Sequence, residues 1–197
     1  LSADSGERGK LDFLYVRNSL AFVTDQHAGQ RLRFEPLTLH AALDTQTSRG
    51  GLVATASTTY SAPFNIARTF ASLDKLSGGR AGWNVVTTSM PEAAGNFGSA
   101  GPMDHATRYE SAAEFVEVVQ GLWDSWEEGA ITTNVETGEY FDKTKVHSLD
   151  NVGKFYSVRG PLNLPRTPQG QPGRGKAGAS DAGKALVRGR AGGGGGG

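Results

Sequence analysis

Two ring side chains four residues apart are the clearest chemical feature of the sequence. His105 and Tyr109 stand at the start of the strongest predicted helix, and this spacing places both rings on one helix face. Because the amino terminus of a helix favours anions, the two rings could bind a phosphate or a polarised heterocycle. The simpler interpretation is that Tyr109 is a core residue and His105 is solvated. His27, His40 and His147 lack partners at a useful spacing, so we interpret them as surface or packing residues.

A second group of candidates stands at the ends of three predicted strands. They are mostly neutral hydroxyl and amide side chains: Arg17, Asn18, Thr55, Ser57, Thr58, Thr59, Asn84, Thr87 and Thr88. Parallel βα folds place their ligands at the carboxyl ends of the strands. This rim lacks the paired carboxylates of glycoside hydrolysis and a tight ligand cluster for a metal. It is therefore more typical of a cofactor-binding surface than of a hydrolytic one.

Several other kinds of chemistry are excluded by what the sequence lacks. The 197 residues include no cysteine, so there is no disulfide framework, thiolate nucleophile or cysteine-ligated metal. A nucleophile elbow, a P-loop and a dinucleotide-binding glycine fingerprint are also missing. The doublets Gly50-Gly51 and Gly78-Gly79 are typical of helix stops. Trp123 and Trp126, at helical spacing, are typical of a core.

The composition predicts one ordered domain and a tail. The chain has 20 basic and 20 acidic residues, but residues 166–197 hold six basic residues and one acidic residue. They also hold 12 of the 28 glycines. Such a composition cannot order itself, so we predict a domain over residues 1–186 and a disordered Gly-rich tail over residues 187–197. Because the tail has no base-stacking aromatic residue, we expect no nucleic-acid binding.

The apolar content predicts a protein without membrane contacts. No apolar run approaches the ~20 residues that cross a bilayer. The chain opens with the polar segment Leu1-Ser2-Ala3-Asp4 instead of a secretory signal. We therefore expect a cytoplasmic protein.

Alternating strands and helices must position the candidate residues. Short apolar runs predict buried parallel strands at residues 11–16, 52–57 and 81–87. Proline starts and glycine stops predict helices at residues 36–49 and from residue 63 to about 76. After a polar loop over residues 88–104, apolar residues from Tyr109 to Trp126 recur at helical spacing and predict a long helix.

The region after Gly129 is less regular. Apolar pieces at residues 139–141 and 154–158 are separated by turn residues and predict an excursion that carries a small hairpin. Three βα units in about 130 residues are compatible with a doubly wound sheet or with the first half of an eight-fold βα barrel.

Longer motifs narrow these alternatives, and they run in unbroken order from about residue 10 to residue 186. They are Arg33-Phe34-Glu35-Pro36-Leu37-Thr38-Leu39, residues 51–60 and 71–87, Asn96-Phe97-Gly98, His105-x-x-Arg108-Tyr109, residues 114–119 and 122–126, and Gly160-Pro161-Leu162-Asn163. Together they resemble the nitrilotriacetate monooxygenase family. This is a branch of the bacterial-luciferase-like flavin monooxygenases that also includes dibenzothiophene-sulfone and EDTA monooxygenases.

The resemblance implies an α/β fold, a partial (β/α)8 TIM barrel of the luciferase-like type. Family members run to more than twice this length, so we expect a truncated chain that holds roughly the first half of the barrel. The implied cofactor is reduced FMN (FMNH2), supplied by a separate NAD(P)H:flavin reductase. Dioxygen would react with the flavin to give a C4a-peroxide that oxygenates a small organic or xenobiotic substrate, while the protein orients and shields the flavin.

The resemblance also implies which residues contact the flavin. Asn18 follows the first strand, and either Thr55 or Thr58 provides the threonine at the end of the second. His105 and Tyr109 match the paired rings of the family motif. Ser180, in Ala177-Gly178-Ala179-Ser180, matches a serine near the next strand.

Two segments depart from the family pattern. Arg17-Asn18 stands where the family usually has Ala-Asp, so an expected carboxylate is replaced and a cation lies beside it. The segment before Ser180 reads Pro172-Gly173-Arg174-Gly175-Lys176, where the family has a β-branched strand. Since glycines and unpaired cations disfavour a buried strand, we predict that this fourth strand does not form as in the family.

Three hypotheses follow for the function. The first is an FMNH2-dependent monooxygenase subunit whose activity is impaired by truncation. The second is an inactive remnant that serves as an interaction or dimerisation module, a homo-oligomer formed through exposed sheet edges. The third is a luciferase-like oxidoreductase that uses the deazaflavin F420.

Overall fold

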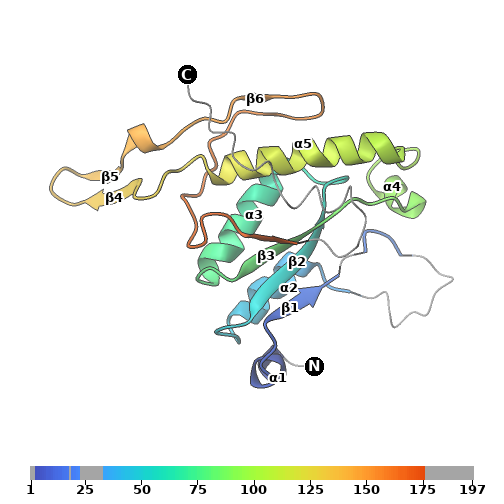
Figure 1. The fold of residues 1–197 in the computed structure, drawn as a ribbon, viewed down its shortest axis with the longest axis horizontal. Coiled ribbons are helices and arrows are strands. Elements are labelled where there is room, and N and C mark those ends of the chain that lie inside the picture. Colours follow the sequence, from blue (N-terminus) through green and yellow to red (C-terminus); the bar gives the residue numbers. More distant parts are fainter. Residues whose placement is uncertain (1–2, 18, 23–32, 176–197) are drawn as a thin grey trace.

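A four-stranded parallel sheet is the centre of the fold (Figure 1). The computed structural model describes residues 3–17, 19–22 and 33–175. The strands, in their order across the sheet, are β1 (Phe13–Val16), β2 (Gly51–Ser57), β3 (Ala81–Val86) and β8 (Gly173–Gly175). Every neighbouring pair is parallel. The α/β prediction is confirmed.

The order of the strands distinguishes the two predicted architectures. A doubly wound sheet reverses its strand order at a switch point. Here β1, β2, β3 and β8 follow one another across the sheet in chain order, as in a barrel. The described sheet is therefore that of a partial TIM barrel, as predicted.

Helices α2 (Pro36–Asp44) and α3 (Pro63–Leu76) pack on one face of the sheet, which we call the outer face, and α5 (His105–Trp123) packs on α3. The described residues also form the short helices α1 (Ala3–Arg8) and α4 (Pro91–Asn96). Alternate residues of β2 and β3, such as Ala54 and Trp83, join buried side chains of α3 and α5 in one core. Trp83 lies at its centre, with ring centroids 5.7 Å from Phe70 and 6.3 Å from Trp123.

The side chains between those residues lie on the opposite, inner face. In register, Tyr15 lies beside Val53, and Thr55 lies beside Asn84. Successive strand residues point to opposite faces, so Tyr15 and Thr55 share the inner face. Helices α2 and α3 lie on the other face.

Helix α2 is shorter than predicted. It begins as expected at Pro36, where the Glu35 carboxylate accepts hydrogen bonds from two backbone amides of the first turn. It ends at Asp44 instead of Arg49. The reason is tertiary, because Asp44 and Thr47 bind the guanidinium of Arg80, which lies 36 and 33 residues away.

Helix α5 also ends earlier than its apolar spacing indicates. Asp104 caps its start by accepting a hydrogen bond from the Thr107 amide at 3.0 Å. Trp123 is buried in the core as predicted. Trp126 lies beyond the helix, where its indole N–H donates to the Leu162 carbonyl at 2.7 Å. The loop predicted over residues 88–104 contains the short helix α4, which begins at Pro91.

The excursion after α5 contains two hairpins where one was predicted. One pairs β4 (Ile131–Asn134) with β5 (Glu139–Phe141), and the other pairs β6 (Asn151–Val152) with β7 (Ser157–Val158). A 3-10 turn, η2 (Lys143–Lys145), lies between them. Figure 1 shows the β4–β5 hairpin projecting away from the sheet.

A fourth strand, three residues long, forms within residues 172–176, for which we predicted that no strand forms as in the family. Gly173–Gly175 pairs in parallel with β3. Two conditions allow it: the strand needs only backbone hydrogen bonds from its glycines, and it stands at the end of the strand order. Arg174 is half-buried, and this burial lowers the pKa of its guanidinium, an effect that Asp124 opposes.

Two of the histidines have the packing or surface roles predicted for them. His40 is fully buried and its Nε2 lies 3.1 Å from the Val53 carbonyl. Burial lowers the pKa of His40. His147 is exposed and its Nε2 lies 2.6 Å from Glu127. His27 lies outside the described residues.

No helix in the described ranges is both long and apolar enough to span a bilayer.

Candidate functional site

The carboxyl ends of β2 and β3 are joined by the predicted hydroxyl side chains. Ser57 Oγ lies 2.8 Å from Thr88 Oγ1, and Thr59 Oγ1 accepts a hydrogen bond from the Thr88 amide at 3.0 Å. Much of the polar rim therefore holds the two strand ends together. Sequence alone could not show this, since the partners are about 30 residues apart.

The structure separates the two threonines that the sequence left as alternatives. Thr58 is 1% exposed, and both its amide and its hydroxyl donate to the Val86 carbonyl, at 2.9 and 3.3 Å. Thr55 lies instead on the inner face, where its Oγ1 accepts a hydrogen bond from Asn84 Nδ2 at 3.0 Å. Thr55 is therefore the threonine whose side chain lies on the inner face, whereas Thr58 links the carboxyl ends of β2 and β3.

Tyr15 completes a polar group with Thr55 and Asn84, which we call the inner-face triad. Asn84 Nδ2 donates to Tyr15 Oη at 3.0 Å, and Thr55 Oγ1 donates to the same oxygen at 3.4 Å. Sequence analysis missed Tyr15, because an apolar run predicts a strand buried on both faces. The signal was the alternation, which places Tyr15 on the face of Thr55 once the register is known.

The paired rings at the start of α5 lie together as the spacing predicts. The ring centroids of His105 and Tyr109 are 4.6 Å apart and the ring planes make an angle of 32°. Asp104 caps this helix end, where hydrogen bonds from the Thr107 hydroxyl and the Thr107 amide lower the pKa of its carboxyl. A carboxylate at the cap would repel an anion, so anion binding by the two rings stays a prediction.

A cleft of about 430 Å³ opens beside the carboxyl end of β2. Its walls come from the loop that follows β2 and the segment that precedes α5: Thr59, Tyr60, Ser61, Ala62, Phe97, Ser99, Gly101 and Met103. The rings of Tyr60 and Phe97 stack with centroids 4.7 Å apart and an angle of 6°. Tyr60 Oη is buried and has no hydrogen-bond partner among the described residues. Sequence analysis did not single out Tyr60.

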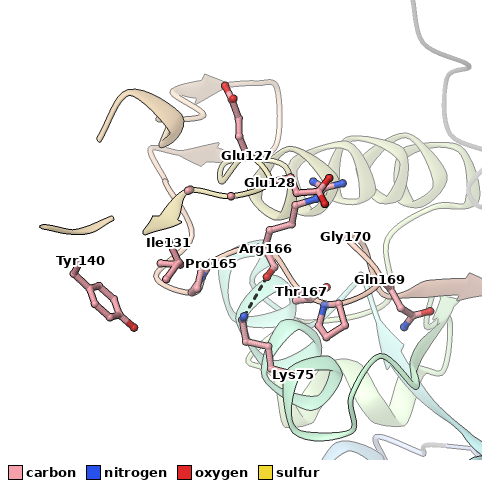
Figure 2. Close-up of a pocket in the computed structure, with 13 residues that line it drawn as sticks. Lys75, Glu127, Glu128, Ile131, Tyr140, Pro165, Arg166, Thr167, Gln169 and Gly170 are labelled. Carbon is pink, nitrogen blue, oxygen red and sulfur yellow. Dashed lines mark hydrogen bonds between the residues drawn. The ribbon is translucent and has the colours of Figure 1, made fainter. Parts of the chain in front are cut away.

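A larger cleft, of about 670 Å³, lies at the other end of the fold. Figure 2 shows it beside the carboxyl end of α3, where Lys75 Nζ donates to the Arg166 carbonyl at 3.1 Å. Two of its charged side chains are paired with residues outside it, Glu127 with His147 and Arg166 with Asp124. Because this cleft adjoins the start of β3, it is remote from the strand ends where βα folds bind their ligands.

The predicted site residues thus form two local groups. Thr55 joins the inner-face triad, and the His105 ring lies against the Tyr109 ring in a tilted arrangement. Asn18 and Ser180 lie outside the described residues. No metal-binding group of His, Asp and Glu occurs within those residues.

Comparison with known proteins gives a consistent result. A family model described as luciferase-like monooxygenase matches residues 19–192. The chain is 58% identical over 185 residues to N-acetyl-S-(2-succino)cysteine monooxygenase of Bacillus subtilis (strain 168), covering 94% of this chain and 42% of that protein. It is 45% identical to nitrilotriacetate monooxygenase component A of Aminobacter aminovorans, covering 93% of this chain and 43% of that protein.

A solved structure also matches the chain over most of its length. Riboflavin lyase, crystallised with modified FMN and the substrate riboflavin, superimposes with a TM-score of 0.84 at 36% identity. The match covers 93% of this chain and 43% of that chain. The chain thus spans less than half the length of the proteins it resembles.

Proposed function

Since the chain belongs to the luciferase-like monooxygenase family, we propose that it takes part in the FMN-dependent oxygenation of a small organic molecule. The observation that carries this proposal is the 58% identity over 185 residues to a named monooxygenase. Reduced FMN, when bound, would supply the electrons with which dioxygen is activated.

We propose a thioether that carries carboxylates as the substrate class. The relative with 58% identity is named for N-acetyl-S-(2-succino)cysteine, and that name denotes a sulfur bonded to two carboxylate-bearing groups. Nitrilotriacetate, for which the relative with 45% identity is named, also carries several carboxylates. A small polycarboxylate is therefore the shared chemistry of these two relatives.

The residues at the carboxyl ends of the strands fit a flavin. Thr55 and Asn84 make the inner face polar and neutral there, which suits an uncharged isoalloxazine ring system. His105 and Tyr109 would hold the flavin through their paired rings. Asn18 and Ser180 remain proposed contacts, on the basis of the sequence motifs alone.

The aromatic pair Tyr60–Phe97 has a separate role in this proposal. Its stacked rings wall the cleft beside β2, so they would limit the access of water to a bound flavin. Exclusion of water strengthens every electrostatic contact inside a site.

We further propose that an NAD(P)H:flavin reductase supplies the reduced FMN, in the cytoplasm. The name "component A" of the nitrilotriacetate relative supports a system of more than one protein. A reductase partner would deliver the cofactor in its reduced state, so the chain itself needs no nicotinamide site.

The test is an anaerobic titration of the 197-residue chain with reduced FMN, followed by flavin fluorescence, with deazaflavin F420 in parallel. We expect micromolar binding of FMN and weaker binding of F420. His105→Ala should weaken FMN binding roughly 10-fold through the loss of a hydrogen bond to a charged group. His147→Ala is the matched control, because His147 is exposed and pairs with Glu127.

Two results would contradict the proposal. Preferential binding of F420 would favour the deazaflavin alternative. A folded chain with a near-UV circular dichroism signal that binds neither flavin would favour the interaction-module alternative.

A further inference from the structure

The side chain of Tyr15 crosses the inner face of the sheet. Tyr15 belongs to β1, yet its hydroxyl reaches Asn84 on β3, two strands away. At the register of Tyr15, β2 carries Val53 and β3 carries Gly82. Gly82 has no side chain, and a Cβ there would lie 3.1 Å from Val53. Tyr15 remains 41% exposed, so much of its surface faces away from the sheet.

The hydrogens of the inner-face triad can be counted one by one. The Asn84 amide has two, and it gives one to Tyr15 Oη and one to Thr55 Oγ1, each at 3.0 Å. The single hydroxyl hydrogen of Thr55 is directed at Tyr15 Oη at 3.4 Å. The three hydrogens of Asn84 and Thr55 are therefore donated inside the triad.

The hydroxyl of Tyr15 has the fourth hydrogen of the triad. Tyr15 Oη accepts two hydrogen bonds, and a phenol also has one hydrogen to donate. Among the residues that the structure describes, Tyr15 Oη donates no hydrogen bond, because Thr55 Oγ1 and Asn84 Nδ2 both act as donors toward it. A hydroxyl that accepts hydrogen bonds is polarised by them and becomes a better donor, because bonds in a chain strengthen one another.

We propose that Tyr15 donates this hydrogen to an acceptor oxygen of the ligand that binds over the inner face, and so helps to determine which ligand binds. The inference rests on the proposed function. The donor is fixed in direction, since Asn84 and Thr55 together hold the hydroxyl from the side of the sheet. A neutral donor of this kind suits a carbonyl or a carboxylate oxygen.

Two ligands present such an oxygen. One is the flavin, whose isoalloxazine carries neutral carbonyls, and the other is a carboxylate-bearing substrate. A hydrogen bond to a charged group is worth more than one to a neutral group. The two sources therefore differ in how much binding is lost when the hydroxyl is removed.

The experiment compares the wild-type chain with Tyr15→Phe, which keeps the ring and removes only the hydroxyl. Each is titrated anaerobically with reduced FMN and, separately, by calorimetry with N-acetyl-S-(2-succino)cysteine. If the flavin oxygen is the acceptor, FMN binding should weaken about 3- to 10-fold. If a substrate carboxylate is the acceptor, binding of the thioether should weaken about 10- to 100-fold.

A matched control and a second readout separate binding from folding. Tyr140→Phe removes the same atom from a tyrosine that is 64% exposed on β5, and both affinities should stay unchanged. The chain has five tyrosines, so carbon-13 labelling at the ring carbon bearing the hydroxyl gives few NMR signals. The Tyr15 signal should shift when the ligand is added, whereas a purely structural Tyr15 would give no shift.

The remaining outcomes are distinct. Equal affinities of wild type and Tyr15→Phe for both ligands, with no shift of the Tyr15 signal, would overturn the role of Tyr15 and leave the proposed function standing. A folded wild-type chain that binds neither ligand would overturn the proposed function, and with it the role of Tyr15.

Discussion

The two ends of the parallel sheet differ in how their polar side chains are hydrogen-bonded. Where the strands begin, Arg80 makes five side-chain hydrogen bonds, including one to Asp44 Oδ1 at 2.5 Å. This equals the number of hydrogens that a guanidinium can donate. Arg80 is thus fully engaged in holding the end of α2 to the start of β3.

Two carboxylates at the same end are also held by several donors. Glu7 Oε1 accepts from three successive backbone amides, those of residues 48–50, at 2.6 to 2.9 Å. Buried Asp74 accepts from the Ala81 amide and from the side-chain amide of Gln169. These contacts join segments that are far apart in the chain.

At the carboxyl ends of the strands, two tyrosine hydroxyls keep a hydrogen to donate. Among the described residues, Tyr60 Oη is buried without a partner, and Tyr15 Oη accepts two hydrogen bonds but donates none. A buried polar group without a partner costs free energy. The amino end of the sheet thus has the larger networks between remote segments, whereas the carboxyl end has tyrosine hydroxyls that a ligand can use, in line with the division of labour in βα barrels.

The largest expected effect comes from Arg80→Met, which leaves Asp44 without its cation. Both side chains are largely buried, at 13% and 15% exposure. We expect the free energy of unfolding to fall by about 3–5 kcal/mol, as when one partner of a buried ion pair is removed. Urea denaturation followed by circular dichroism measures it.

The matched control is Arg49→Met, which removes an exposed arginine next to the same loop. It should change the free energy of unfolding by less than about 0.5 kcal/mol. A loss below about 1 kcal/mol in Arg80→Met would show that this end of the sheet does not depend on its ion pair.

An effect of opposite sign is expected at the other end. Tyr60→Phe removes a buried hydroxyl that has no partner and keeps the ring stacked on Phe97. We expect the free energy of unfolding to rise by up to about 1 kcal/mol, since the desolvation penalty disappears. Thermal unfolding of the wild type and the variant, side by side, gives the sign.

Ligand binding sharpens the same variant. If Tyr60 is kept for a ligand, Tyr60→Phe should bind reduced FMN or the thioether more weakly while it unfolds at a higher temperature. A variant that is less stable than the wild type would mean that the hydroxyl has a partner, and the contrast between the two ends would weaken.

The smallest effect concerns Glu7 and appears as a pH dependence. Hydrogen bonds from the amides of Arg49 and Gly50 lower the pKa of Glu7 from 4.5 to about 2. A carboxyl whose pKa is lowered by folding stabilises the protein above its unfolded pKa. This stabilisation is lost as the pH falls through the folded value.

Glu7→Gln should therefore flatten the loss of stability between about pH 4.5 and pH 2. Urea midpoints measured at several pH values across this interval give the comparison. Glu139→Gln, at an exposed position on β5, should keep the slope of the wild type. An unchanged slope in Glu7→Gln would show that the carboxylate does not anchor α1.

Much of the fold could be predicted because its signals are local. Helix α3 has proline at its start and Gly78 in a left-handed conformation beyond its end, at φ 64°. The predicted bounds of β2 and β3 agree with the structure to within one residue at each end. The ring contact between His105 and Tyr109 follows from their spacing along one helix.

The structure differs from the prediction where residues that are distant in the chain make contact. Helix α2 stops early because its end binds Arg80, and the glycines of β8 form a strand because β3 offers them a backbone partner. Trp126 keeps the helical spacing but binds the Leu162 carbonyl outside the helix. In each case a contact between remote segments outweighs the local pattern.

The sequence by itself determined the family, the alternation of strands and helices, and most of the candidate residues at the carboxyl ends of the strands. Periodicity, prolines, glycines and motif order carry that information over short stretches of chain. Only the tertiary structure decided that Thr55 and not Thr58 faces inward, and that Tyr15 retains a hydrogen to donate. The reason is that a hydrogen-bond count depends on every partner, and Asn84 lies 69 residues from Tyr15 along the chain.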